Sequence, residues 1–468
     1  MREYDVLIIG AGQAGIPLAR TLSQKKWRVA IVEQKHLGGS CVNFGCTPTK
    51  AVVASARVAH VARRAADFGL VLPEPKIDFA KVLGRARDIV EGSKASLAKG
   101  LEESSADLIW GHARLTGRDE KGFVIAINGE AVRAKQVVID TGARTLLPDI
   151  AGLDDVPFLH AGNWLDSKAL PDHVVFAGAG YIALEMAQFY RRMGAQVTVI
   201  GPDKQVVQHE DADVALALQR TLENEGIIFR LNSRVKAVSR DGQAVRVALE
   251  SLGKDESVTG SHFFIATGRR PNTNDLGFET VGVKVNDRGV IEVDDRLATS
   301  VPGIWAAGDV RGGPMFTHTA WDDYRILESQ LLGDVKHTKA GRVIPYAIFT
   351  DPELGRVGMT EDEARRKHGD HVRVATFPMK FNGKATELGE TCGFIKLVGD
   401  SRDRKLLGAA VLAVEGAELA GIYITLMNAR ATIDTICDGI YIHPTLAEAA
   451  QSAASALKLQ FETELKAR

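Results

Sequence analysis

A strand, a glycine-rich turn, a helix and a second strand follow one another twice in this chain, and no other feature restricts the fold as strongly. The first copy has the apolar run Val6–Ile9, the turn GAGQAG from Gly10, and a second apolar run that ends at Glu33. In such a turn Gly10 permits a tight bend, Gly12 permits close approach to a pyrophosphate, and Gly15 permits close packing of helix on strand. The helix then offers free N–H groups to the phosphates. This copy predicts a βαβ unit that binds a dinucleotide.

The second copy contains the turn GAGYIA, and its second strand ends at Gly201. Gly178, Gly180 and Ala183 occupy the three fingerprint positions of that turn. Glycine-rich turns also arise for purely conformational reasons, so one copy alone is a weak signal. Two copies, each between a strand and a helix, favour two dinucleotide-binding units over two turns without a ligand. Each unit closes on a strand that ends in Thr-Gly, at Thr141 and Gly142 and at Thr267 and Gly268.

The remaining segments surround these two units. Residues 51–110 have the apolar periodicity of helices, and residues 111–140 have that of short strands. From Tyr346 onward, strands and helices alternate without a glycine fingerprint. The sequence therefore predicts an α/β protein with two Rossmann-like domains and a C-terminal α+β domain.

Composition excludes several kinds of partner. The 468 residues carry 58 Lys and Arg against 59 Asp and Glu, a net charge of −1, which gives no general attraction to nucleic acid or an anionic membrane. No apolar run approaches the ~18 to 20 residues of a spanning helix, and the first strand follows Asp5 directly, which leaves no room for a signal peptide. We therefore expect a cytoplasmic protein with no nucleic-acid or membrane partner.

Four cysteines are too few to form a disulfide framework in a chain of this length. The close pair Cys41 and Cys46 is therefore the first candidate for a redox-active or metal-binding site. Such a pair can close a small disulfide that is easily reduced. A zinc site usually needs two more Cys or His ligands, and none accompanies the pair, so we expect no metal site. Two buried free thiols are the plainer alternative. For the other two cysteines, Cys392 and Cys437, small buried thiols are the better interpretation.

Residues 39–50, GSCVNFGCTPTK, resemble the active-site signature of the flavoprotein pyridine nucleotide-disulfide oxidoreductases, the family of dihydrolipoamide dehydrogenase, glutathione reductase and mercuric reductase. Two further blocks agree in the right order. AAGD at 306–309 is similar to the family's second flavin-binding motif, and HPTLAE at 443–448 is similar to its C-terminal acid–base motif. The resemblance covers essentially the whole chain.

The resemblance implies that the first unit binds FAD, with Glu33 on a ribose hydroxyl and Asp309, next to Gly308, at the ribityl-pyrophosphate region. It implies that the second unit binds NADH or NADPH. Lys50 and Glu185 match positions that pair beside the flavin, and an ordinary ion pair between helices is the alternative. The implied domains are FAD-binding at 1–150 and, for its central part, 273–345, NAD(P)-binding at 151–272, and dimerisation at 346–468.

The resemblance also assigns the thiol chemistry. Cys46 would be the thiolate against the flavin, and Cys41 the interchange thiol that meets the substrate. His443 would move the proton of a departing thiol, with Glu448 orienting its imidazole. A lone histidine before proline is otherwise usually a turn residue. Because the family takes this motif from the neighbouring subunit, the resemblance implies a homodimer with shared active sites.

Three functions remain open. The first is an NAD(P)H-dependent disulfide or dithiol oxidoreductase that acts on a small disulfide such as a lipoamide-type substrate, and the intact His443 and Glu448 motif favours it. The second is a metal-ion reductase, because blocks 316–327 and 349–360 resemble the mercuric-reductase-like branch that includes reactive-chlorine-resistance reductases. The last residues, 460–468, lack the vicinal cysteines of resistance-type mercuric reductases, which disfavours mercury. The third is a redox-sensing flavoprotein without turnover.

We predict that the protein discriminates only weakly between NADPH and NADH. Gly201 stands where an acidic side chain would select NADH. Lys204 could pair with a 2′-phosphate, and Ala183 often accompanies NADP binding, whereas Asp203 acts the other way. We expect a slight preference for NADPH.

Overall fold

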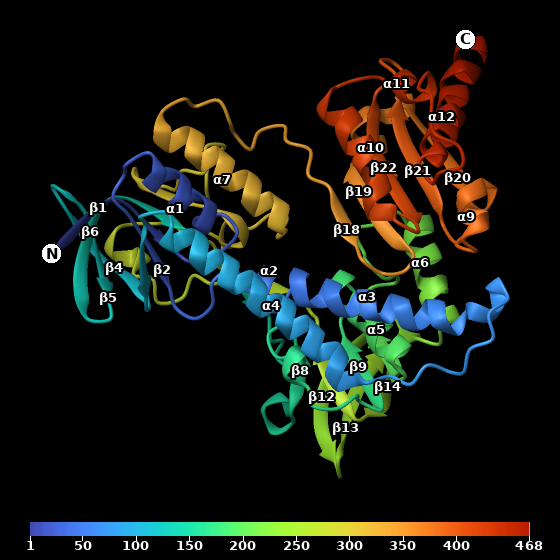
Figure 1. The fold of residues 1–468 in the computed structure, drawn as a ribbon, viewed down its shortest axis with the longest axis horizontal. Helices are drawn as coiled ribbons and strands as arrows, with labels where there is room; N and C mark the ends of the chain where they lie inside the picture. Colours follow the sequence, from blue (N-terminus) through green and yellow to red (C-terminus); the bar gives the residue numbers. More distant parts are fainter. Residues whose placement is uncertain (468) are drawn as a thin grey trace.

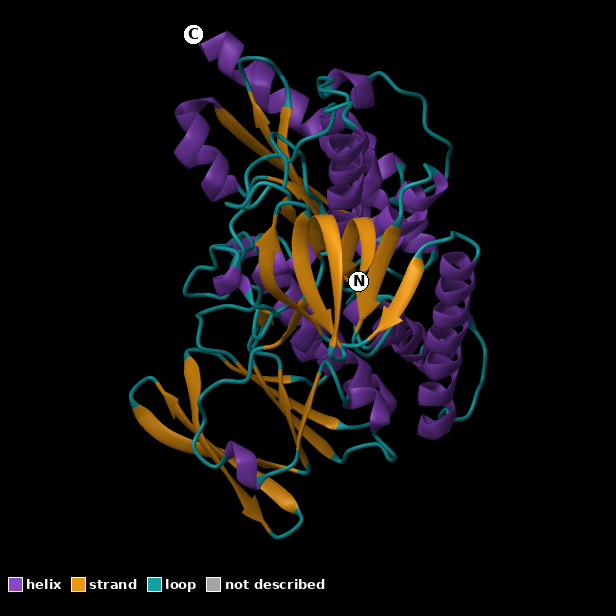
Figure 2. Ribbon diagram, turned by 90° about the vertical axis from the view of Figure 1, so that its left-hand side faces the viewer, coloured by secondary structure: helices purple, strands orange, loops and turns teal. Residues whose placement is uncertain are grey.

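The computed structural model describes residues 1–467, and three large sheets organise them (Figure 1). The first sheet contains the N-terminal strand and has helices beside it (Figure 2). Its order is β3-β2-β1-β6-β5-β4, with β17 also paired to β6. Strands β3, β2, β1, β6 and β17 pair in parallel with their neighbours. Strand β5 pairs antiparallel with β6 on one side and with β4 on the other. The strands are β1 (Arg2–Ile9), β2 (Val29–Glu33), β3 (Asp107–Trp110), β4 (Ala113–Asp119), β5 (Gly122–Ile127), β6 (Glu130–Ile139) and β17 (Ile304–Ala306).

The first glycine turn follows the carboxyl end of β1, and the helix behind it covers the first sheet. The run Val6–Ile9 is buried, because parallel strands flank β1 on both sides and each face of the strand packs into an apolar cluster. The helices of this part are α1 (Gly15–Gln24), α2 (Gly39–Asn43), α3 (Cys46–Arg63), α4 (Phe79–Glu102) and α7 (Thr317–Leu332), with the short 3-10 helix η5 (Gly308–Arg311).

The second sheet carries the second glycine turn. Its five strands are all parallel, in the order β11-β10-β9-β15-β8, and a three-stranded antiparallel sheet lies beside it. The strands are β8 (Phe158–His160), β9 (His173–Ala177), β10 (Gln196–Ile200), β11 (Ile228–Arg230), β15 (His262–Ile265), and then β12 (Ser233–Asp241), β13 (Ala244–Ser251) and β14 (Lys254–Gly260). The helices are α5 (Tyr181–Met193) and α6 (Ala212–Asn224). A two-stranded ribbon, β7 (Ala143–Thr145) with β16 (Arg269–Pro271), joins the first two parts of the chain.

The third sheet lies in the C-terminal part and is antiparallel throughout, in the order β18-β19-β22-β21-β20. Its strands are β18 (Tyr346–Ile348), β19 (Glu353–Gly358), β20 (Val372–Pro378), β21 (Phe394–Asp400) and β22 (Leu406–Ala413). The helices are α8 (Glu361–His368), α9 (Gly383–Glu387), α10 (Gly416–Asn428), α11 (Asp434–Cys437) and α12 (Glu448–Ala467). The predicted α/β class with a C-terminal α+β part is therefore confirmed.

The expectation that residues 51–110 are helical throughout is wrong in two places. Residues 69–78 contain no helix, because Pro73 and Pro75 cannot continue one. Residues 107–110 form β3, which pairs in parallel with β2 and extends the sheet. The two apolar residues Leu108 and Ile109 do not by themselves distinguish a strand from the end of a helix; only the pairing of β3 with β2 does.

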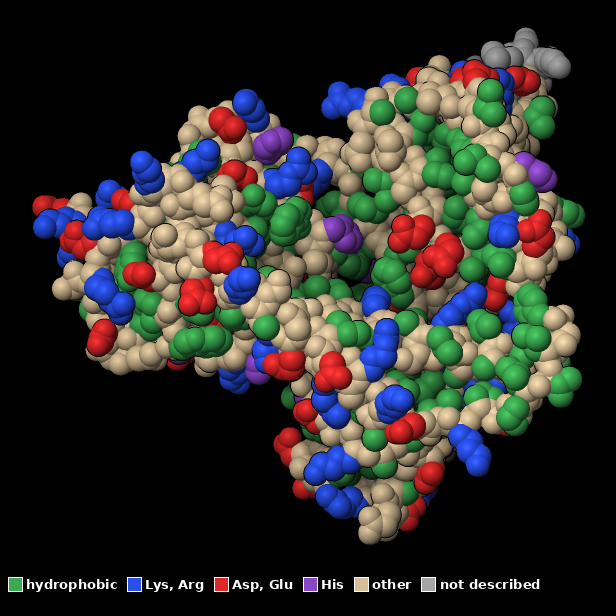
Figure 3. Space-filling view, in the orientation of Figure 1, with side chains coloured by type: hydrophobic (Ala, Val, Ile, Leu, Met, Phe, Trp, Pro, Cys, Tyr) green, Lys and Arg blue, Asp and Glu red, His purple; other side chains and the backbone are tan. Residues whose placement is uncertain are grey.

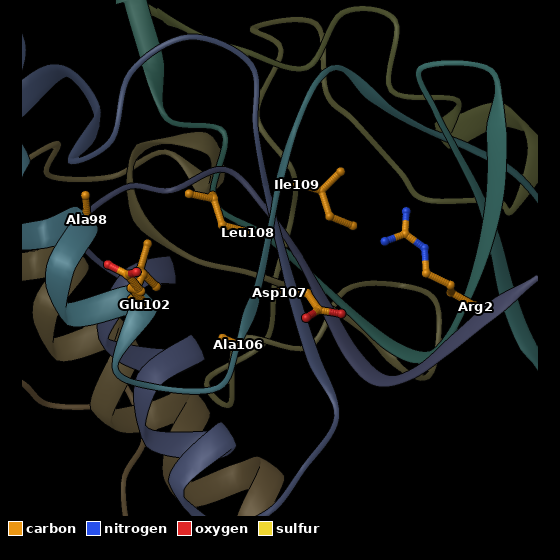
Figure 4. A pocket seen from close by; sticks show the side chains of 8 residues that line it. Arg2, Ala98, Glu102, Ala106, Asp107, Leu108 and Ile109 are labelled. Atoms are coloured by element: carbon orange, nitrogen blue, oxygen red, sulfur yellow. The ribbon is translucent and has the colours of Figure 1, made fainter.

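The surface carries mixed charges and shallow hollows. On the face in Figure 3, Lys and Arg side chains are interspersed with Asp and Glu. A hollow of about 390 Å³ opens between the end of α4 and β3 (Figure 4). Arg2 at the start of β1 lines it, so it lies at the opposite end of the strands from the glycine turn. Within residues 1–467, no helix is both long and apolar enough to cross a membrane.

Candidate active site

Cys41 and Cys46 lie side by side at the start of α3. The short helix α2 carries Cys41, and Cys46 is the first residue of α3. The Gly45 N–H donates to the Ser40 carbonyl oxygen at 2.7 Å, which folds the chain back between the two cysteines. Both cysteines are free thiols in the structure, and the Cys41 thiol hydrogen bonds to Cys46.

The surroundings favour a thiolate at Cys46. The hydrogen bond from Cys41 contributes most, and the Thr317 hydroxyl, 3.3 Å from the Cys46 sulfur, and the charge of Lys50 add to it. Although burial opposes them, these groups lower the pKa of Cys46 to about 6. The hydrogen bond to Cys46 and burial raise the pKa of Cys41 above its ordinary value. At neutral pH, Cys46 is thus ionised while Cys41 keeps its proton.

Lys50 and Glu185 form the expected pair. The Lys50 ammonium lies 2.7 Å from a carboxylate oxygen of Glu185, which is only 3% exposed. The Phe349 N–H donates to the other oxygen of Glu185 at 2.9 Å, and the ammonium lies 4.5 Å from the centre of the Phe349 ring. Because Lys50 is one helical turn after Cys46, the pair fixes the charge next to the thiolate.

The first glycine turn is shaped to take a close ligand. Gly10 has a φ of +106°, and a Cβ there would lie 2.2 Å from the Asp140 carbonyl oxygen, so only glycine fits. The Glu33 carboxylate accepts N–H hydrogen bonds from Ala11 at 2.9 Å and from Lys35 at 2.7 Å, which fastens the turn to the end of β2. The N-terminus of α1 then faces the space in front of the turn. This arrangement fits the pyrophosphate of FAD.

The second flavin-binding block lies across from this turn. Asp309, in η5, is 2.7 Å from Arg269, whose guanidinium also donates to the Ser40 hydroxyl at 3.1 Å. The Gly308 N–H donates to Asp323 of α7, which is fully buried. Arg269 therefore connects the second block to the loop that carries the cysteines.

The second glycine turn is open to a ligand. Gly178 has a φ of +108°, and a Cβ there would lie 2.3 Å from a backbone oxygen of residue 266. A Cβ at Gly180 would meet no protein atom within 4 Å, so the space in front of it can take a phosphate. Ala183 is buried in α5. Gly201 follows β10, and Gly268 follows the closing strand β15, as Thr141 and Gly142 follow β6.

His443 and Glu448 form a contact of their own in the C-terminal part. The imidazole Nδ1 lies 3.0 Å from a Glu448 carboxylate oxygen, and the Thr445 N–H donates to the other oxygen at 2.9 Å. His443 is 78% exposed. It lies between α11 and α12, which Figure 1 shows well separated from α2 and the start of α3. Within one chain, His443 is therefore remote from the cysteine pair.

Sequence reasoning gave no role to Thr317, Arg269 or Asp323. Thr317 contacts a cysteine 271 positions away, and Arg269 contacts Ser40, which is 229 positions away. Asp323 accepts from the Gly308 N–H, 15 positions earlier. Thr317 and Asp323 both lie within block 316–327, which resembles the family, and that was the only available signal. Proximity of this kind appears only after folding.

The expectation for the remaining two cysteines is wrong. Cys392 is exposed, and its sulfur lies 3.1 Å from the Thr221 hydroxyl, because it belongs to the loop before β21 and no core covers it. Cys437 ends α11 and is only half-buried. In the part of the chain that the structure describes, no group of three or more His, Cys, Asp or Glu side chains is arranged to hold a metal.

Two Rossmann-like sheets, a close cysteine pair at a helix start and a separate antiparallel domain form the architecture of a flavoprotein disulfide reductase. The chain belongs to the pyridine nucleotide-disulphide oxidoreductases: the model of that family matches residues 4–323, and the model of its dimerisation domain matches residues 344–454. It is an enzyme of a family that uses FAD and NAD(P)H.

Three relatives show how far the similarity extends. The probable pyridine nucleotide-disulfide oxidoreductase RclA of Escherichia coli is 33% identical and covers 98% of this chain and 100% of its own length. Dihydrolipoyl dehydrogenase of Cupriavidus necator is 33% identical, covering 97% of this chain and 98% of its own. Mercuric reductase of Bacillus cereus is 29% identical, and the match covers 95% of this chain and 70% of that protein.

The solved structures agree. The Cu(II) complex of the HOCl-induced flavoprotein disulfide reductase RclA from Escherichia coli has a TM-score of 0.88 and 32% identity, covering 97% of this chain and 99% of that one. LpdA from Mycobacterium tuberculosis has a TM-score of 0.88 at 26% identity, with the same coverage.

Proposed function

We propose that this enzyme reduces a small disulfide, with a lipoamide-type compound as the first candidate, at the expense of NAD(P)H. The observation that carries the proposal is the pair Cys41 and Cys46, in which one sulfur is an ionised thiolate and the other keeps its proton. Reduction of a disulfide needs two neighbouring sulfurs, one to attack the substrate and one to close the pair again, and each attacks as a thiolate. Full-length similarity to dihydrolipoyl dehydrogenases supports the lipoamide class.

The thiols act in a fixed order in this proposal. Cys41 loses its proton and attacks the substrate disulfide, which forms a mixed disulfide and releases one substrate thiol. Cys46 then attacks the Cys41 sulfur, which closes the Cys41–Cys46 disulfide and releases the second thiol. Since the pKa of Cys41 is raised, this sulfur needs a base. His443 is that base, and it returns the proton to the departing thiol.

FAD, when bound, takes a hydride from NAD(P)H and supplies the two electrons that reopen the disulfide. The groups proposed to hold it are the turn at Gly10, Gly12 and Gly15, with Glu33, Thr141, Gly142, Gly308, Asp309 and Lys50. Those proposed for the nicotinamide dinucleotide are Gly178, Gly180, Ala183, Gly201 and Gly268. Glu185 holds Lys50 in place, and the positive charge of Lys50 helps to lower the pKa of Cys46, although the Glu185 carboxylate partly opposes this effect.

The proposed assembly is a homodimer in which a second copy supplies His443 to each cysteine pair. The dimerisation-domain match supports it. Near His443, the apolar side chains Ile440 and Ile442 are 101% and 80% exposed, and a second copy would cover them. The three main sheets support the proposed division at 1–150, 151–272, 273–345 and 346–468. We also propose that the enzyme works in the cytoplasm.

Steady-state oxidation of NADPH and NADH with a panel of small disulfides tests the proposal. We expect turnover with lipoamide or another disulfide in the panel, and a loss of at least roughly 10²-fold in Cys41→Ser. Cys392→Ser is the matched control, because that thiol is outside the pair, and it should turn over like the native enzyme. Absence of turnover with every disulfide would contradict the proposal.

A metal-ion reductase is the second candidate, supported by the Cu(II) complexes solved for RclA and by the similarity to mercuric reductase. Adding Cu(II) and Hg(II) to the same panel separates the two. Metal-dependent NAD(P)H oxidation without any disulfide turnover would favour the metal-ion reductase. Flavin reduction without turnover on either group of acceptors would favour a redox sensor.

A further inference from the structure

Asp140 is a buried carboxyl group that touches both halves of the proposed FAD cradle. It follows β6 and is 6% exposed. The Gly15 N–H donates to its Oδ2 at 2.7 Å, and a Cβ built on Gly12 would lie 2.7 Å from the same oxygen. On the other side, a Cβ built on Gly308 would lie 2.8 Å from Oδ1. The carboxyl group therefore fills the space between the first glycine turn and the second flavin-binding block.

The carboxylates near Asp140 have arginine partners, whereas Asp140 itself has none among the described residues. Asp309 pairs with Arg269 at 2.7 Å, and the buried Asp323 of α7 pairs with Arg311 at 2.5 Å and with Arg342 at 2.9 Å. Among the residues that the structure describes, no cation pairs with Asp140.

The backbone of α1 offers Asp140 only N–H groups, those of Ala14 and Gly15. Burial, with the nearby Asp309 and Asp323, raises the pKa of Asp140 well above its ordinary value, and these N–H groups only partly oppose the rise. A third carboxylate here would also stand next to a pyrophosphate that carries negative charge of its own.

We propose that Asp140 is a positioning residue for FAD, whose carboxyl group joins the Gly10–Gly15 turn to the Gly308 turn and so holds both cofactor-binding segments in place. The inference rests on the proposed FAD site. In its uncharged form the carboxyl group still accepts the Gly15 N–H and adds no charge beneath the pyrophosphate. Ionisation keeps the hydrogen bond but adds repulsion, so FAD should bind more weakly as the pH rises through the pKa of Asp140.

FAD release from the diluted holoenzyme, followed by flavin fluorescence between pH 6 and pH 9.5, tests the proposal. For the native enzyme we expect the dissociation constant to rise with pH by about tenfold, roughly 1.4 kcal/mol. Asp140→Asn keeps the shape and an acceptor but cannot ionise, so its FAD affinity should match the native value at pH 6 and stay level. Asp140→Ala removes the link between the turns and cannot ionise, so its dissociation constant should be about tenfold above the native value at pH 6 and should stay level with pH.

Glu120→Gln is the matched control, since Glu120 is an exposed carboxylate in the turn between β4 and β5. It should reproduce the native profile. The same pH dependence in Asp140→Asn and the native enzyme would overturn the proposal, as would native affinity of Asp140→Ala at pH 6. If Asp140→Ala fails to fold, the Asp140→Asn profile still decides. A native protein that binds no FAD would instead contradict the FAD site itself.

Discussion

The Lys50 ammonium lies 2.7 Å from a Glu185 carboxylate oxygen, and this ion pair joins the helix that begins at Cys46 to the helix behind the second glycine turn. The proposed site for the nicotinamide cofactor and the reactive thiols are thereby fixed relative to each other. Because Glu185 is almost fully buried, its charge depends on Lys50 for compensation.

Lys50→Met should therefore destabilise the fold by roughly 1 to 3 kcal/mol, less than a fully buried pair would cost, because Lys50 is partly exposed. The double variant Lys50→Met/Glu185→Gln should recover much of that loss, since a neutral amide needs no cation. Urea unfolding of the holoenzymes measures both free energies of unfolding. A double variant no more stable than Lys50→Met would show that the buried charge is not the cause.

The Cys46 thiolate should titrate near pH 6. Since the pKa of this thiol is lowered to about 6, the thiolate is present above that pH and is lost as the pH falls through it. Thr317→Val removes one hydrogen bond to the thiolate and should raise the apparent pKa to about 7, because such a bond is worth about 1.5 kcal/mol. The pH dependence of iodoacetamide alkylation of the reduced enzyme, with the site identified by mass spectrometry, measures this value. Equal titration in native enzyme and Thr317→Val would remove Thr317 from the site.

His443→Ala should lower disulfide turnover by roughly 10²-fold while leaving flavin reduction by NAD(P)H almost unchanged. His443 would act only on the substrate thiol and on Cys41. Stopped-flow measurement of the two half-reactions separates them. An equal loss in both would indicate a structural role at the dimer interface.

Mixed dimers test whether the site is shared. Random re-association of equal amounts of Cys41→Ser and His443→Ala makes half of the dimers mixed, and each mixed dimer then has one intact site if His443 comes from the second copy. Activity should recover to about a quarter of the native value. If no activity were recovered, Cys41 and His443 of the same chain would form each active site.

The cofactor preference should be weak, with kcat/KM for NADPH and NADH within about two orders of magnitude and a slight advantage for NADPH. The Gln208 amide donates to both Asp203 carboxylate oxygens, at 2.8 and 3.0 Å, which fixes this carboxylate in the loop after β10. Asp203→Asn should shift the ratio toward NADPH, and Lys204→Ala should shift it toward NADH. No change in either variant would show that this loop does not contact the adenosine ribose.

An acidic substitution at Gly201, which the sequence alone favours as the test, does not suit this fold. A Cβ at Gly201 would lie 2.8 Å from the Ala179 Cβ. The strand end would have to move before any carboxylate could face the ribose.

Local patterns determined most of what could be predicted. The apolar run Val6–Ile9 lies within β1, and helix α5 follows the second glycine turn, as the repeated pattern predicts. The close approach at Gly10 and the contact between His443 and Glu448 follow motifs of a few residues.

Contacts between distant segments were beyond sequence reasoning. The Thr317 hydroxyl beside Cys46, the Arg269 bridge to Asp309 and the carboxyl group of Asp140 between two turns depend on how separate elements pack. The edge strand β3 was missed for the same reason, because only its pairing with β2 distinguishes it from a helix end.

The central claim is that Cys46 faces the flavin and Cys41 faces the substrate, and anaerobic reduction of two serine variants tests it most directly. After two-electron reduction by NADPH, the native enzyme should show a long-wavelength thiolate-to-flavin charge-transfer band. Cys41→Ser has no disulfide to accept electrons, so it should show the band while its flavin is oxidised and lose it as NADPH reduces the flavin. Cys46→Ser should lack the band throughout. Both variants should lose disulfide turnover. Full disulfide turnover in either variant, or a band that persists without the Cys46 sulfur, would contradict the account.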